Sequence, residues 1–387
     1  MNHPTINPSA PHPIAPHAAP IALHAARIYT ATGNPADGAP GYITIADGTI
    51  TAIGPQPEPR AEVIECGDVD LIPGLVDLHS DCWDTKARPR PSTTFPLDDA
   101  LMVLDTEAVA WGITTHFTCI VIQGNVTKAR SLEQALASVD SFRRLRPHLR
   151  SDHRIHLRVD PSTKYGDTVR RLAADGDVAL MSYLGDTAGQ GSFADRDGAD
   201  DGERLSVRYE RQASAQAVRD ELANLAKVHA ITLVSHDDYD REAVESSRDL
   251  GVGIIEFPVT REAAQAARDH RIPAVMGAPN LLRGSSHNGN LSAREALEAD
   301  LLRIIASDYY PPALLRSLYK AAEDGLACFG DVLALGTANP ARAANLTDRG
   351  TLEPGKRADI VAVEHRNGQP VVAQTWIGGR QAFGARQ

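Results

Sequence analysis

The stretch Gly74-Leu75-Val76-Asp77-Leu78-His79-Ser80-Asp81 decides the fold class, because it is a short apolar strand that ends in an imidazole and a carboxylate. Further apolar stretches of similar length follow it, and patterns typical of helices lie between them. Strands that alternate with helices indicate βα units and a parallel sheet. Eight such strands predict an α/β fold, a TIM-like (β/α)8 barrel. The expected strands are residues 75–79, 113–121, 155–160, 178–185, 231–236, 253–257, 274–278 and 304–308.

The two ends of the chain differ from the middle, because they show short alternating runs broken by turns such as Asp47-Gly48. We therefore expect a disordered tail over 1–20, a small β-sandwich built from 21–70 and 345–387, and the barrel over 71–344. A doubly wound open sheet is the alternative, but no Gly-x-Gly-x-x-Gly motif follows the first strand. The expected helices of the middle are 98–110, 131–145, 214–229, 241–250, 261–270 and 293–299.

Composition narrows the function classes. The 387 residues carry a formal net charge of −11, which argues against nucleic acid as a partner and leaves a small-molecule substrate. No apolar run reaches the roughly 18 residues that a membrane span needs, so no membrane partner is expected. The four cysteines form no Cys-x-x-Cys pair, which suits a reducing, cytoplasmic setting. A homo-oligomer stays open.

Ligand-type side chains end several of the expected strands. His79 and Asp81 stand at positions i and i+2, so both point to the same face. Asp160, His236 and Asp308 end three other strands. Because parallel-barrel enzymes place their chemistry at this rim, we expect these residues to hold one or two divalent ions, zinc first, with manganese or iron as alternatives. Zinc lowers the pKa of bound water to roughly 7, and Asp308 is placed to bind metal and accept the proton.

Short motifs extend this pattern from about residue 70 to residue 365. They are LIPGLVDLHSD (71–81), PRP (89–91), GITT (112–115), HRIHLR (153–158), SHDD (235–238), EFPVT (256–260), MGAPN (276–280), RGSSHNGN (283–290), SDYYP (307–311) and GKRADIV (355–361). Together they resemble the amidohydrolase superfamily, and within it the ribose methylphosphonate triphosphate diphosphatases of the carbon–phosphorus lyase pathway. The resemblance implies a metal-dependent hydrolase that releases pyrophosphate from a ribose phosphonate triphosphate.

The resemblance also suggests further site residues. Glu256 ends the sixth strand, where many relatives have a histidine ligand, so it is a candidate for the metal. His287 lies in the loop after the seventh strand and is a candidate to bind substrate or to donate a proton to the leaving group. His156 is interpreted as a core residue or one that supports the ligands. The candidate substrate contacts are Arg88, Arg90, Gln190, Asn280, Arg283 and His287.

The chain departs from the family at several positions. Asp160 stands where the family usually has a longer Glu, and no lysine ends the fourth strand, so a carbamylated lysine is not indicated. The segment 185–193 lacks a His and an Arg and gains Asp186, which weakens the case for a triphosphate. Cys82 follows the first ligands and is interpreted as a packed free thiol.

Three hypotheses follow from these motifs and departures. The first is a metal-dependent diphosphatase acting on a ribose-phosphonate or nucleotide-like substrate through metal-activated water. The alternative is an amidohydrolase or deaminase that cleaves a C–N bond of a small cyclic or guanidine-like substrate. The third is a non-catalytic protein that binds a ligand at the barrel mouth. In each case the Asp- and Gly-rich segment 189–202 is expected to form a mobile loop at the site.

Overall fold

The computed structural model describes residues 19–34, 37–90, 92–123, 131–161, 165, 167–184, 205–286 and 290–384, without the side chains of 205–213. Most of the expected tail and the whole segment 189–202 lie outside these residues. The chain divides into two compact units. The first contains Phe117–Arg144 and Arg154–Arg303, and the second contains Pro11–His116, Leu145–His153 and Ile304–Gln387.

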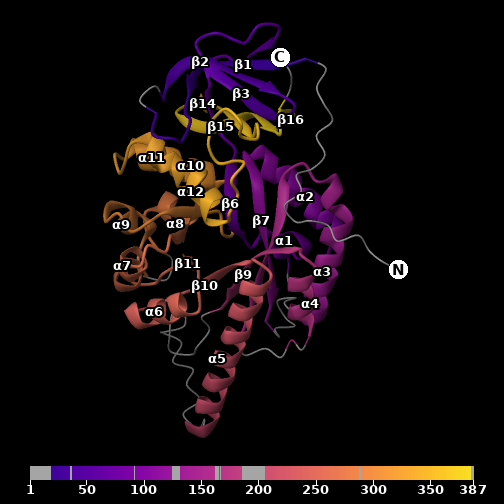
Figure 1. Cartoon of the computed structure of the whole chain (residues 1–387), viewed down its shortest axis with the longest axis vertical. Coiled ribbons are helices and arrows are strands. Elements are labelled where there is room, and N and C mark those ends of the chain that lie inside the picture. Colours follow the sequence, from indigo (N-terminus) through magenta and orange to yellow (C-terminus); the bar gives the residue numbers. More distant parts are fainter. Residues whose placement is uncertain are drawn as a thin grey trace. The chain divides into compact units, whose positions relative to one another are not determined.

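The expected parallel barrel is confirmed. Eight strands form one hydrogen-bonded sheet in the order of the sequence, from β6 to β13. Figure 1 labels β6, β7, β9, β10 and β11 of this sheet. A parallel bridge between Ser80 and Asp308 joins the first of these strands to the end of the last. An open doubly wound sheet would reverse its strand order, so that alternative is wrong. The strands are β6 (Leu75–Ser80), β7 (Ile113–Ile122), β8 (Asp152–Val159), β9 (Val178–Tyr183), β10 (Thr232–His236), β11 (Ile254–Glu256), β12 (Ala274–Gly277) and β13 (Ile304–Ala306).

The six expected helices are present, and capping residues mark the start of several of them. Asp240 accepts a hydrogen bond from the N–H of Ala243 at 2.8 Å, and Thr260 accepts one from Ala263 at 3.1 Å. Such caps satisfy backbone donors that the first helical turn leaves open. These helices are α2 (Leu97–Ala110), α3 (Leu132–Leu145), α5 (Leu205–Val228), α6 (Arg241–Asp249), α7 (Arg261–Asp269) and α9 (Ala293–Glu298).

Other helices of the described residues were not expected from the pattern. Most are short, and a helix of six or seven residues is too brief to show a 3.6-residue period. They are α1 (Cys82–Ala87), α4 (Thr168–Ala174), α8 (Ala278–Arg283), α10 (Ala313–Glu323), α11 (Phe329–Ala334) and α12 (Ala338–Ala343). No described helix is long and apolar enough to cross a membrane.

The two ends of the chain form a second sheet, as expected, within the second unit. Asp47 and Gly48 make the tight turn between β2 and β3, both with positive φ, which such a turn requires. The strands are β1 (Ile21–Ile28), β2 (Ala39–Ala46), β3 (Thr49–Gly54), β4 (Glu62–Glu65), β5 (Asp70–Pro73), β14 (Ile360–Arg366), β15 (Gln369–Ile377) and β16 (Arg380–Phe383). The sheet runs β16-β15-β14-β5-β1-β2-β3, with β4 beside β1. The domain boundaries given above stay predictions.

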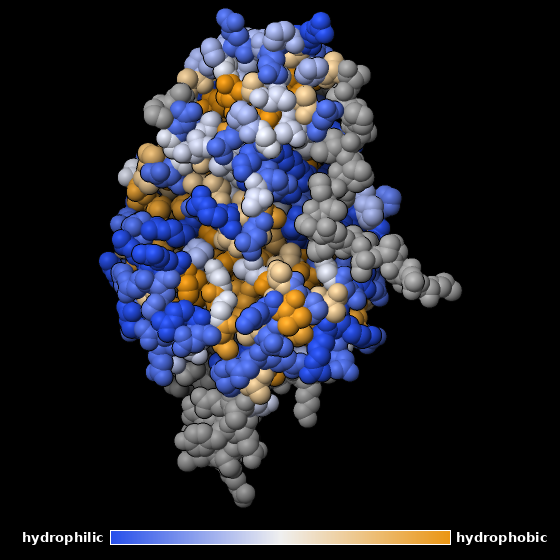
Figure 2. Space-filling model, in the orientation of Figure 1, coloured by the Kyte–Doolittle hydropathy of each residue, from blue (hydrophilic) through white to orange (hydrophobic). Residues whose placement is uncertain are grey.

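Polar side chains cover most of the face drawn in Figure 2, and smaller apolar areas lie among them. This distribution is ordinary for a chain with 23% charged residues.

Candidate metal centre

The ends of β6 and β13 meet inside the second unit. The N–H of Asp308 donates to the carbonyl of His79 at 2.9 Å, and the N–H of Asp81 donates to the carbonyl of Asp308 at 3.0 Å. These two backbone bonds continue the sheet past the last residue of β13. They fix Asp308 beside the first strand, as the closed barrel predicted.

Three of the predicted ligands gather at this seam. His79, Asp81 and Asp308 each offer one ligand atom, and these atoms lie within 4.8 Å of one another. The Nε2 of His79 is 3.6 Å from a carboxylate oxygen of Asp81. His79 is only 1% exposed, so its ring is held in one place. One imidazole with two carboxylates is a ligand set that suits a first-row divalent ion.

Asp77 supports this group, and the sequence reasoning missed it. Its Oδ1 accepts the N–H of Ser307 at 2.9 Å and the N–H of His79 at 3.4 Å, so one carboxylate holds both strand ends. Burial raises the pKa of Asp77 to about 6. The signal in the sequence was an acid inside an otherwise apolar strand, because a fully buried carboxylate needs partners.

Three strand ends carry a non-glycine residue in the left-handed region. Asp308 has φ of 58°, Asp237 has 63° and Phe257 has 54°. Such conformations cost on the order of 1–3 kcal/mol each and tend to cluster at functional sites. Each lies within two residues of its strand, where the chain turns away from the sheet.

In the first unit, His236 and Glu256 are register partners on β10 and β11. Each offers a ligand atom within 4.8 Å of the other. The guanidinium of Arg158 donates to Nε2 of His236 at 2.8 Å, because arginine has no acceptor. The proton of His236 is therefore on Nδ1, which lies 3.1 Å from Asp237. A metal at Nε2 requires Arg158 to move, a constraint that the sequence did not reveal.

Asp160 lies just after β8 and is 8% exposed, and its N–H donates to the carbonyl of Ile122 at 2.9 Å. Its place at a strand end agrees with the expected position. The roles of Asp160, His236 and Glu256 as ligands stay predictions.

The candidate substrate contacts fall into three groups. Gln190 and His287 lie outside the described residues. Asn280 uses its side-chain oxygen to accept the N–H of Ala293 at 2.9 Å, which ties α8 to the start of α9. The three arginines, Arg88, Arg90 and Arg283, are half-buried or exposed.

Cys82 lies at the start of α1 and is 3% exposed. Its thiol points to the carbonyl of Asp308 at 3.9 Å, and burial raises the pKa of the thiol to about 12. The sulfur is therefore a protonated, packed thiol at neutral pH, in agreement with the interpretation of a free cysteine.

Comparison with known proteins places this geometry in a family. Residues 222–382 match the model of the Amidohydrolase family. The chain is 34% identical over 364 residues to the alpha-D-ribose 1-methylphosphonate 5-triphosphate diphosphatase of Escherichia coli (strain K12), covering 89% of this chain and 96% of that protein.

Solved structures support the fold. The dihydropyrimidinase of Brevibacillus agri NCHU1002 is similar with a TM-score of 0.67 at 13% identity, covering 95% of this chain and 96% of that one. The N-acetyl-D-glucosamine-6-phosphate deacetylase of Mycobacterium smegmatis is similar with a TM-score of 0.62 at 18% identity, covering 94% and 100%. The chain thus belongs to the amidohydrolase superfamily, as a divergent member of the alpha-D-ribose 1-methylphosphonate 5-triphosphate diphosphatase family, and is a hydrolase.

Proposed function

We propose that the chain hydrolyses a phosphoanhydride of a ribose-phosphonate or nucleotide-like triphosphate and releases pyrophosphate. The observation that carries this proposal is the 34% identity over nearly the whole length to a diphosphatase of that class. The seam of β6 and β13 supports it, because it brings His79, Asp81 and Asp308 within ligand distance of one another.

The donor set of this seam fits a divalent ion, and we propose zinc, with manganese and iron as alternatives. A divalent ion bound there supplies a nucleophile at neutral pH by lowering the pKa of its water to roughly 7. His79 would hold the ion through its buried ring. Asp308 accepts the proton of the attacking water, since its carboxylate lies in the same group of ligand atoms.

We also propose roles for the remaining predicted residues. Asp160, His236 and Glu256 are proposed as further ligands, and they leave open a second ion. Arg88, Arg90 and Arg283 are proposed to bind the phosphates, because guanidinium groups pair with phosphate oxygens in a fixed geometry. Asn280, Gln190 and His287 complete the proposed substrate contacts, and His287 protonates the leaving group.

The test is direct turnover. The purified chain, loaded with zinc, manganese or iron, should release one pyrophosphate for each ribose phosphonate triphosphate consumed. ATP is assayed separately as an alternative substrate. Failure to hydrolyse either triphosphate with any of the three metals would overturn the proposal.

A C–N hydrolase is the second candidate, because similar solved structures include a dihydropyrimidinase and a deacetylase. The loss of a His and an Arg from the segment 185–193 also favours a less anionic substrate. Turnover of a dihydropyrimidine or an N-acetyl sugar phosphate, with none of the triphosphates, would establish this candidate instead.

We also propose a cytoplasmic setting and a small-molecule substrate without nucleic-acid or membrane partners. The four cysteines, Cys66, Cys82, Cys119 and Cys328, are all free thiols in the structure, which suits a reducing compartment.

A further inference from the structure

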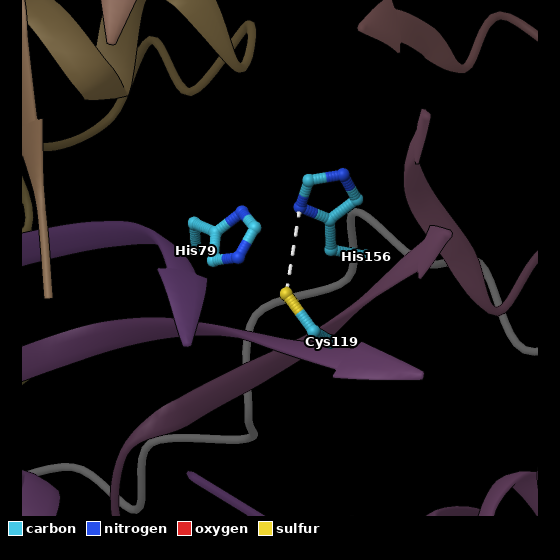
Figure 3. Close-up of side chains that lie close together, drawn as sticks. All are labelled: His79, Cys119 and His156. Atoms are coloured by element: carbon cyan, nitrogen blue, oxygen red, sulfur yellow. Dashed lines mark hydrogen bonds between the residues drawn. The ribbon is translucent and has the colours of Figure 1, made fainter. Parts of the chain in front are cut away.

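A second set of ligand-type side chains lies on β7 and β8 within the first unit. The Sγ of Cys119 is 3.9 Å from Nδ1 of His156 (Figure 3). Both residues are buried, with Cys119 at 4% and His156 at 0% exposure. His79, the third side chain drawn in Figure 3, belongs to the second unit.

The separation of the two atoms matches that of neighbouring ligands on one ion. With bonds of about 2.3 Å to sulfur and about 2.0 Å to nitrogen, a tetrahedral angle places sulfur and nitrogen about 3.5 Å apart. The observed 3.9 Å exceeds this by a few tenths of an ångström. The sulfur and nitrogen therefore need only a small approach to share an ion.

The other nitrogen of His156 is held in the way that metal ligands are held. Its Nε2 lies 3.0 Å from the hydroxyl oxygen of Ser182, on β9. A hydrogen bond from Nε2–H to Ser182 would leave the lone pair on Nδ1, the tautomer that a metal at Nδ1 requires. That lone pair is on the side of the ring that faces Cys119.

We propose that Cys119 and His156 bind one divalent metal ion, through the thiolate sulfur and Nδ1. Binding replaces the S–H bond of Cys119 by a sulfur–metal bond and releases its proton to water. A thiolate is a soft ligand, so the site takes zinc, iron or cobalt in preference to magnesium or calcium. This site is distinct in its donors from the carboxylate-rich seam proposed for hydrolysis, and its test does not depend on turnover.

Cobalt(II) is the probe, because a cobalt–thiolate bond gives a charge-transfer absorption in the near ultraviolet that nitrogen and oxygen ligands do not give. The full chain is stripped of metal and titrated with cobalt while absorption and proton release are followed. Cys119→Ser removes the proposed ligand. Cys82→Ser is the matched control, because Cys82 is also buried, at 3% exposure, and lies beside the candidate ligand Asp308.

We expect the thiolate band in the wild type and in Cys82→Ser, and its loss in Cys119→Ser. Ser182→Ala should keep the band at saturation but weaken cobalt binding by about 10-fold or more, because the ring loses its support. If Cys119→Ser does not fold, the thiolate band of the wild type and the cobalt affinity of Ser182→Ala still test the proposal.

A wild type that binds cobalt without the band overturns the proposal. So does a band that survives in Cys119→Ser or disappears in Cys82→Ser. The proposed hydrolysis would survive each of these results, since triphosphate turnover is measured separately. Conversely, a thiolate band in a protein that hydrolyses no triphosphate would support this site and overturn the proposed function.

Discussion

Asp308 combines an unusual backbone with a central place among the candidate ligands. Its φ is 58°, and asparagine tolerates this conformation as well as aspartate does. Asp308→Asn should therefore fold normally and lower triphosphate turnover by about 10²- to 10⁴-fold, because the amide cannot accept the proton. Turnover and thermal melting measure the two effects.

Asp300→Asn is the control for this variant, since Asp300 also has φ of 58° but is exposed and pairs with Arg303 at 2.6 Å. It should keep full activity. Equal activity in the two variants would show that Asp308 is not the general base.

Asp77 acts on the site through its backbone partners rather than through the substrate. Asp77→Ala leaves the N–H of Ser307 without its acceptor, which should cost about 1–3 kcal/mol of unfolding free energy. Because His79 and Asp308 then lose their fixed spacing, metal affinity should fall by about 10- to 100-fold. Competition with a chromophoric chelator measures the affinity without any turnover.

Asp77→Asn separates geometry from charge, because the amide keeps an oxygen acceptor in the same place. We expect it to retain most of the metal affinity. An Asn variant as weak as the Ala variant would mean that the charge of Asp77, and not its hydrogen bonds, supports the site.

His116 should make stability depend on pH. Burial, aided by the nearby His153, keeps the pKa of His116 well below its usual value, so the ring is neutral in the folded state. The unfolded chain takes up the proton below about pH 6.5, so stability is present above that value and is lost as the pH falls. The loss between about pH 8 and about pH 6 should be on the order of 1 kcal/mol.

Urea unfolding of the wild type and of His116→Asn at the two pH values isolates this effect. Among the described residues, Asp77 lies 3.8 Å from Nε2 of His116, and the ring centroid of His153 lies 5.0 Å from that of His116. Burial raises the pKa of Asp77 to about 6, so this carboxyl titrates mainly at the acid end of the interval. An equal loss of stability in the wild type and the variant would contradict the role of His116.

Among single residues, the sequence predicts those site residues whose role depends on their position along a strand. The sequence predicted that His79, Asp81 and Asp308 lie close together, because both the strand period and the closure of the barrel follow from the pattern. Asp77, Arg158 and Ser182 were missed because their importance comes from partners on other strands. No spacing along the chain reveals which strand will lie opposite.

Between elements, a buried ion pair ties the segment after α12 to β8. Arg349 is 5% exposed, and its Nη1 lies 2.7 Å from Asp152 and 2.8 Å from the hydroxyl of Thr115. Arg349→Ala leaves Asp152 buried with much less compensation, so we expect a loss of about 3–5 kcal/mol in urea unfolding.

The double variant Asp152→Asn with Arg349→Met should recover part of this loss, because neither charge then remains buried. Arg241→Ala removes an exposed pair with Asp269, 2.7 Å apart, and should cost only about 0–1 kcal/mol. A cost for Arg349→Ala as small as that of Arg241→Ala would show that the buried pair contributes nothing.

The sequence pattern predicts some helices and strands and misses others. The strands of the barrel were predicted because each is a short apolar run between polar segments, and α6 and α7 because helical patterns lie between such runs. Helices such as α1 and α8 escaped because each has only six residues. Both directly follow a strand end, so tertiary contacts, and not helical periodicity, decide their conformation.

For the whole molecule, the proposed ligands of the seam all belong to one unit, the second. A bound ion should therefore stabilise that unit in particular. At an ion concentration about 100 times its Kd, the gain is about 2.7 kcal/mol, which for a chain of this length raises the melting temperature by about 3 °C. A chelator should reverse the shift in differential scanning calorimetry.

The control is the same chelator already saturated with zinc, which should leave the melting curve unchanged. Asp81→Asn should make the protein much less sensitive to the free chelator, because one carboxylate of the seam is lost. A wild type that melts identically with and without the chelator, after loading with each of the three metals, would argue that neither the seam nor the site of Cys119 and His156 holds an ion. Hydrolysis would then have to rely on side chains such as the buried imidazole of His79 and its two carboxylate neighbours, which is hard to sustain because water at its ordinary pKa is a poor nucleophile at neutral pH.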